Sequence, residues 1–112
     1  MKPHDYKIVR MTQAINNLIQ DIKTKTFYAE KIILFGSIAR GEIHERSDMD
    51  ICIVSDEELP PQQRGQMESY FYQMAQNEFS LDFVYCDINK LQNGNKVFER
   101  IRQEGRVLYE RI

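Results

Sequence analysis

The fold is decided by one stretch of sequence, Lys31-Ile-Ile-Leu-Phe-Gly-Ser-Ile-Ala-Arg-Gly-Glu-Ile-His-Glu-Arg-Ser-Asp-Met-Asp-Ile-Cys-Ile-Val54. Its first five residues form an apolar, β-branched run that ends at Gly36, which is typical of a buried strand. Its last seven residues, Asp48–Val54, predict a second strand that begins with two acids. The residues between are polar and carry two glycines, so we expect a turn, with one helical turn at Ser37–Arg40, and then a loop.

The sequence on either side of this stretch predicts helices and two further strands. Apolar residues recur at spacings of three and four before it, as in an amphipathic helix: Ile8, Met11, Ile15, Leu18, Ile19 and Ile22. The expected helices run from Asp5, as N-cap, to about Lys25, from Gln62 to about Phe79, and from Asn89 to Gln103, where Gly105 stops the last one. The further strands are Leu81–Cys86 and an edge strand, Arg106–Tyr109. This order predicts one domain, residues 1–112, of the α/β (α+β) class, with helices packed on a small mixed sheet.

Composition excludes several classes of protein. The 112 residues carry a net charge of −2, so the chain has no bulk positive field for direct nucleic-acid binding or for an anionic membrane surface. No apolar run approaches the roughly 20 residues that span a bilayer, and no apolar segment follows the N-terminal charges as in a secretory signal. Cys52 and Cys86 each lie in an apolar run, and we interpret them as reduced core residues of a cytoplasmic protein.

The pair Asp48 and Asp50 is the strongest chemical signal. Alternate side chains of a strand share a face, so both carboxylates project to one side, followed on that face by Cys52 and Val54. Adjacent carboxylates repel each other unless a proton or a cation lies between them, and Mg²⁺ prefers such oxygen ligands. Taken alone, the pair is also compatible with two acids that solvate the end of a strand.

Three other positions add to this signal. Gly36 and Ser37 directly follow a strand, where glycine permits a close backbone approach and free N–H groups bind phosphate; an ordinary turn is the alternative. Arg40 either reaches the same phosphates or is a solvated loop charge. Asp82 is an acid within an apolar strand, which is costly unless it is paired or metal-bound, and we favour it over Asp87, which faces the other way at the strand's end.

Together these residues resemble the minimal nucleotidyltransferase family of the polymerase-beta superfamily. The resemblance rests on Phe35-Gly36-Ser37, ten residues from Ile38 to Ser47, and then Asp48-Met49-Asp50-Ile51. Asp82-Phe83-Val84 and the ending Glu104-Gly105-Arg106-Val107-Leu108-Tyr109 are similar to the same family. The resemblance extends from about Ile32 to Tyr109 and implies a polymerase-beta-like nucleotidyltransferase fold.

The resemblance also implies an activity and a partner. By this analogy Asp48 and Asp50 bind two Mg²⁺ ions. Asp82 binds one of them, the catalytic ion, and helps to deprotonate the acceptor hydroxyl. A second set of residues then contacts the nucleotide, ATP: Gly36, Ser37, Arg40 and Ser47. Small members of the family are commonly encoded with a HEPN-domain partner, and the resemblance implies an antitoxin of a type VII-like HEPN/MNT module, which transfers AMP to a tyrosine of the HEPN RNase toxin.

Two alternatives stay open beside that activity. In the first, the chain neutralises its partner by binding alone, without catalysis. In the second, it is a nucleotidyltransferase that modifies the hydroxyl group of a small molecule. Because 112 residues leave no room for a separate acceptor domain, we expect the acceptor surface to come from a partner or from a homo- or hetero-oligomer.

Overall fold

The sheet and the helices that pack on it are described by a computed structural model over residues 3–24, 29–42, 48–56, 59–75 and 80–111. Four strands lie in the order β3-β2-β1-β4. Their bounds are Lys31–Phe35 for β1, Asp48–Val54 for β2, Ser80–Cys86 for β3 and Arg106–Glu110 for β4. β1 pairs antiparallel with β2 and β4, and β2 pairs parallel with β3, so the predicted mixed sheet with an edge strand at its C-terminal end is confirmed.

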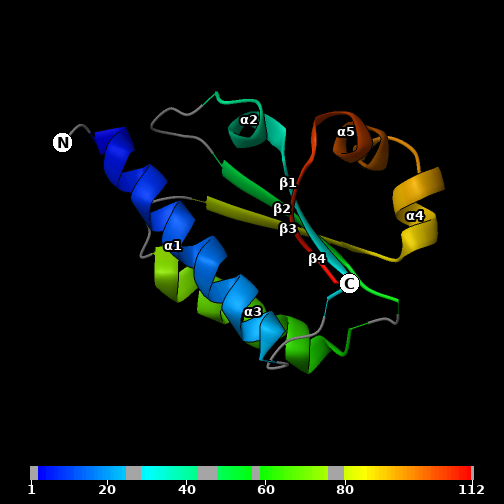
Figure 1. The fold of residues 1–112 in the computed structure, drawn as a ribbon, viewed down its shortest axis with the longest axis horizontal. Coiled ribbons are helices and arrows are strands. Elements are labelled where there is room, and N and C mark those ends of the chain that lie inside the picture. Colours follow the sequence, from blue (N-terminus) through cyan, green and yellow to red (C-terminus); the bar gives the residue numbers. More distant parts are fainter. Residues whose placement is uncertain (1–2, 25–28, 43–47, 57–58, 76–79, 112) are drawn as a thin grey trace.

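The helices cover both faces of this sheet (Figure 1). They are α1 (Pro3–Lys23), the single turn α2 (Gly36–Ala39), α3 (Pro61–Ala75), α4 (Ile88–Asn93) and α5 (Val97–Glu104). Figure 1 shows α1 and α3 side by side on one face, and α4 and α5 on the other, with α2 beside α5. No described helix combines the length and the apolarity that a bilayer span requires.

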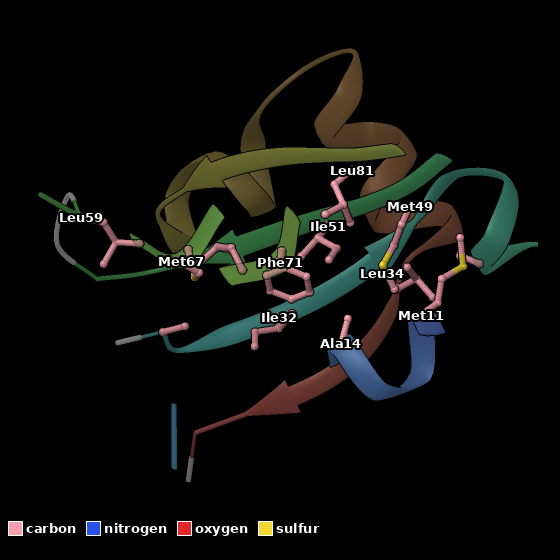
Figure 2. Close-up of a cluster of buried hydrophobic side chains, with 13 residues drawn as sticks. Met11, Ala14, Ile32, Leu34, Met49, Ile51, Leu59, Met67, Phe71 and Leu81 are labelled. Atoms are coloured by element: carbon pink, nitrogen blue, oxygen red, sulfur yellow. The ribbon is translucent and has the colours of Figure 1, made fainter. Parts of the chain in front are cut away.

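The larger core lies between the sheet and the α1–α3 layer. β2 contributes Met49, Ile51 and Ile53 to it, and α3 contributes Met67 and Phe71, all of them fully buried. Figure 2 shows Phe71 of α3 directed at the sheet beside Ile32 and Ile51. Of the residues predicted for the apolar stripe of α1, Met11 is buried and Ile15 and Ile19 are partly buried, whereas the side chains of Ile8, Leu18 and Ile22 lie outside the described ones.

A second core lies on the opposite face, beneath α4 and α5. Cys52 and Val54 of β2 and Ile33 and Phe35 of β1 meet Ile101 of α5 there. The predicted division of β2 into two faces is therefore confirmed, and Asp48 and Asp50 belong to the face that α5 covers. Both cysteines are free thiols, as expected, with their sulfur atoms 3.6 Å apart across β2 and β3.

Two predicted helices differ from the structure. A single helix from Asn89 to Gln103 is wrong, because the chain turns at Asn93-Gly94-Asn95: Gly94 is extended, and Lys96 has a positive φ of 56°. The triplet is rich in turn formers, a signal that outweighs the helical spacing around it. The predicted start at Asp5 is also wrong, since α1 already begins at Pro3, whose fixed φ suits the first turn of a helix.

Candidate nucleotidyl-transfer site

The turn after β1 fits only a glycine. Phe35 is fully extended, and Gly36 then takes a positive φ of 77° and starts α2. The N–H of Arg40 closes that single turn by donating to the carbonyls of Gly36 and Ser37, both at 3.2 Å. A β-carbon at Gly36 would collide with the carboxylate of Asp50, which lies directly against the turn. The backbone of α2 and the side chain of Asp50 are therefore in contact.

Strand register brings the second and third predicted acids together. Asp50 is the residue of β2 opposite Phe35 on β1 and opposite Asp82 on β3. Three neighbouring strands thus deliver Gly36, Asp50 and Asp82 to one corner of the sheet. The predicted cluster of carboxylates requires β2 and β3 to be neighbours in the sheet, and the structure pairs these two strands.

Asp48 and Asp82 form the open side of this corner. Asp48 lies two residues before Asp50 on the same face and is paired in register with Ser80. Both Asp48 and Asp82 are exposed, whereas Asp50 is half-buried. A ligand that arrives from solvent therefore meets Asp48 and Asp82 first and Asp50 at the floor.

The electrostatics of the corner centre on Asp50. Burial raises its pKa above the ordinary value, and the negative charges of Asp82 and Asp48, with a hydrogen bond to the carboxyl group of Asp82, raise it further. The positive charge of Arg100 on α5 acts in the opposite direction. Asp50 therefore holds a proton more tightly than a solvated aspartate, and a cation in the same position would remove the repulsion.

These carboxylates are a suitable donor set for Mg²⁺. Hard oxygen ligands from one or two carboxylates, completed by substrate phosphates, are what this ion takes in nucleotide enzymes. Within the described residues, no three acidic, histidine or cysteine side chains are grouped tightly enough to enclose a metal ion by themselves. The donor chemistry fits the ion, and the exposed side chains of Asp48 and Asp82 are the ones that have to turn toward it.

The predicted phosphate-binding residues are distributed less evenly. Ser37 is half-exposed at the second position of α2, next to Gly36. Arg40 is not a solitary loop charge, because its guanidinium donates to Glu104 of α5 at 2.9 Å and to Glu42 at 3.1 Å. Ser47 lies outside the described residues.

Two further observations concern residues that sequence reasoning treated differently. Asp87, the rejected competitor of Asp82, caps α4: its carboxylate accepts from the N–H of Lys90 at 2.8 Å. Arg100, the cation that acts on Asp50, was missed altogether. No local signal marks it, because its position depends on α5 packing back over β1 after the turn at Gly94.

Comparison with known proteins identifies the family. The family described as "Polymerase beta, Nucleotidyltransferase" matches residues 16–112, which include every acid of this corner. The chain belongs to the polymerase beta nucleotidyltransferase family. The expected fold class and the resemblance stated from the residues are thereby confirmed.

Individual relatives resemble the chain over part or most of its length. A curated protein of Methanocaldococcus jannaschii, named "Putative protein adenylyltransferase MJ0604", is 49% identical over 45 residues, which are 39% of this chain and 45% of that protein. The match thus spans less than half of the relative's length. A chain of the crystal structure described as "the toxin-antitoxin with AMP-PNP" has a TM-score of 0.63 at 21% identity, covering 87% of this chain and 73% of that one.

A second solved structure shares the fold. It is a tri-AMPylated Shewanella oneidensis HEPN toxin in complex with MNT antitoxin, and its matching chain has a TM-score of 0.57 at 18% identity. The match covers 89% of this chain and 72% of that one. At these identities the two structures support the fold of this chain, and what they bind is a property of those proteins.

Proposed function

We propose that this chain is a Mg²⁺-dependent nucleotidyltransferase that moves AMP from ATP to a hydroxyl group, a tyrosine of a cognate HEPN toxin, and so acts as an antitoxin. One observation carries the proposal: Asp50 lies against the turn at Gly36 and opposite Asp82, the second strand acid. Family membership supports the reaction type, because the matched residues, 16–112, include Gly36 and the three acids.

Each residue has a role in this proposal. The N–H groups of the turn at Gly36 and Ser37, with the hydroxyl of Ser37, bind the phosphates of ATP, and Arg40 and Ser47 stay predicted members of the nucleotide site. Asp48, Asp50 and Asp82 are the residues that would hold Mg²⁺. A metal held by these residues would supply positive charge to offset the negative charge of the phosphates and of the departing pyrophosphate.

The chemical step needs a base near the acceptor. In the proposed reaction the acceptor oxygen forms a bond to the α-phosphorus of ATP while the bond from that phosphorus to pyrophosphate breaks. Asp82 is exposed at the edge strand β3 and takes the hydroxyl proton, whereas the half-buried Asp50 stays fixed by the Gly36 turn. In this proposal Asp82 acts as the base, and Asp50 holds the metal.

The HEPN partner is proposed from two complexes whose matching chains share this fold. Two solved structures that share the fold are toxin–antitoxin complexes, one with a HEPN toxin that carries AMP groups and one with AMP-PNP. We propose that this chain forms a similar toxin–antitoxin complex in the cytoplasm. The partner would then supply the surface that presents the acceptor hydroxyl.

The test is transfer of label from ATP labelled at the α-phosphate. The chain is incubated with Mg²⁺ and a HEPN-domain protein encoded beside it, and label is expected on that protein. The Asp48→Asn/Asp50→Asn variant and Asp82→Asn should lose transfer. Asp87→Asn, which removes the acid that caps α4 directly after the other end of β3, should retain it. Neutralisation of the HEPN protein by Asp48→Asn/Asp50→Asn, without label on either protein, would refute the catalytic function and leave binding alone.

A further inference from the structure

The ion pair between Arg40 and Glu104 joins two parts of the chain that are 64 residues apart. Arg40 is the residue at which α2 ends, and Glu104 is the last residue of α5. The nitrogen and oxygen atoms are 2.9 Å apart, a short charge-assisted hydrogen bond. The interaction therefore connects the turn at Gly36 and Ser37 directly to α5, which covers the same face of the sheet.

Glu104 is itself firmly anchored. One turn before it, Ile101 is buried in the second core, and directly after it Gly105 donates its N–H to the carbonyl of Ile101 at 2.8 Å. A β-carbon at Gly105 would press against that carbonyl and against Ile33 of β1, so the end of α5 lies tightly on the sheet. The backbone of Glu104 is thus held close to β1, from which α2 begins.

The other carboxylate that contacts Arg40 differs in this respect. Glu42 lies two residues from Arg40 in the chain and its side chain is 60% exposed, against 25% for Glu104. Its contact with Arg40 is therefore local to the α2 turn. The contact of Glu104 with Arg40 instead joins the turn to α5, a part of the fold that is distant in the sequence.

We propose that Glu104 is a positioning residue of the nucleotide site: by holding Arg40 it keeps the turn at Gly36 and Ser37 in place, and Arg40 serves the phosphates through the turn rather than by touching them. This inference rests on the proposed function, because it concerns how that site holds ATP. The contacts agree with it, since the guanidinium of Arg40 is already paired with two carboxylates.

The sign of one substitution distinguishes positioning from direct contact. If Arg40 touches phosphate, Glu104 competes with the phosphate for it, and Glu104→Gln tightens nucleotide binding. If Glu104 positions the turn, Glu104→Gln weakens binding. We expect the dissociation constant for AMP-PNP with Mg²⁺ and the KM for ATP to rise about fivefold, with kcat within about twofold.

Two matched variants control for charge and for stability. Glu42→Gln removes a carboxylate from the same guanidinium, and Glu110→Gln removes one from the ion pair with Lys31, 3.4 Å long, at the other end of β1. Both should leave KM within about twofold. In the Glu42→Gln background, where no carboxylate lies beside position 40, the exchanged pair Arg40→Glu/Glu104→Arg keeps the contact and should return the KM of Glu104→Gln toward that of the parent. This exchange carries the test if Glu104→Gln fails to fold.

Each result decides one question. Tighter or unchanged AMP-PNP binding by Glu104→Gln, or an exchanged pair no better than the single variant, overturns the positioning role. An effect of Glu110→Gln as large as that of Glu104→Gln also overturns it. Failure of the parent chain to bind AMP-PNP is a different outcome, because it removes the proposed function itself.

Discussion

Replacing Gly36 with alanine is expected to damage the site and the fold together. Gly36 has a φ of 77°, and a β-carbon there would overlap the carboxylate of Asp50. Gly41 offers a matched control five residues away, because its φ is 80° and a β-carbon there meets nothing within 4 Å. Gly41→Ala therefore carries only the cost of the backbone conformation, and Gly36→Ala carries the same cost plus the displacement of Asp50.

The two costs can be separated in magnitude. A left-handed conformation costs a non-glycine residue about 1–2 kcal/mol. Forcing a methyl group into an occupied space typically adds about 1–3 kcal/mol. At about 4 °C per kcal/mol for a domain of this size, Gly36→Ala should melt about 4–12 °C below Gly41→Ala. It should also lose AMP transfer, because Asp50 has moved, whereas Gly41→Ala keeps it.

Urea and thermal denaturation of the two variants measure the difference, and label transfer measures the activity. The double variant Gly36→Ala/Asp50→Ala removes the overlapping carboxylate atoms, so it should lose no more stability relative to Asp50→Ala than Gly41→Ala loses relative to the parent, although it stays inactive. Equal stability of Gly36→Ala and Gly41→Ala, with full transfer by both, would contradict the contact between the turn and Asp50.

Four further predictions concern the corner and the core. The raised pKa of Asp50 means that the native state holds its proton more tightly than the unfolded chain, so the stabilisation present below the unfolded pKa, about 4, is lost as the pH rises through the folded pKa. Without metal, Asp50→Asn should therefore unfold at higher urea than the parent at pH 7 but not at pH 4; a less stable variant at pH 7 would refute this. Ser37→Ala should raise the KM for ATP about tenfold with kcat preserved, as for a lost hydrogen bond to a charged group of ~1.5 kcal/mol; an unchanged KM would exclude its hydroxyl from the phosphates. Arg100→Gln should move the acidic limb of the pH–rate profile to higher pH, since Arg100 lowers the pKa of Asp50; an unmoved limb would separate the two groups. Phe71→Ala should lower the free energy of unfolding by about 3–5 kcal/mol, because Phe71 is fully buried, and a loss below 1 kcal/mol would contradict the core.

The strands of this fold follow closely from the sequence. Apolar, β-branched runs bounded by glycine or acids fix β1 and β2 to the residue, and period-2 alternation separates the Asp50 face from the Met49 face. The expected turn after Phe35 and its single helical turn are also present. These features are local, so a single sequence contains enough information to predict them.

The interactions between distant segments do not follow from the sequence in this way. Whether Asp82 meets Asp50 depends on the order of strands in the sheet, which no local pattern encodes. The pairing of Arg40 with Glu104 and the approach of Arg100 to Asp50 both depend on how α5 packs back on the sheet. A turn at Asn93-Gly94-Asn95 sets that direction, and the helical spacing around the triplet concealed it.

The most direct test of the central claim is to locate bound nucleotide and metal in the protein in solution. Mn²⁺ with AMP-PNP is added to the nitrogen-15-labelled chain, and paramagnetic broadening is mapped onto the amide resonances. The account predicts that Gly36, Ser37, Asp50 and Asp82 broaden at the lowest Mn²⁺ concentration, and that Cys86, about 13 Å farther along β3, broadens only at higher concentration. Broadening centred elsewhere, or unchanged by Asp48→Asn/Asp50→Asn, would contradict the claim that this corner is the nucleotidyl-transfer site.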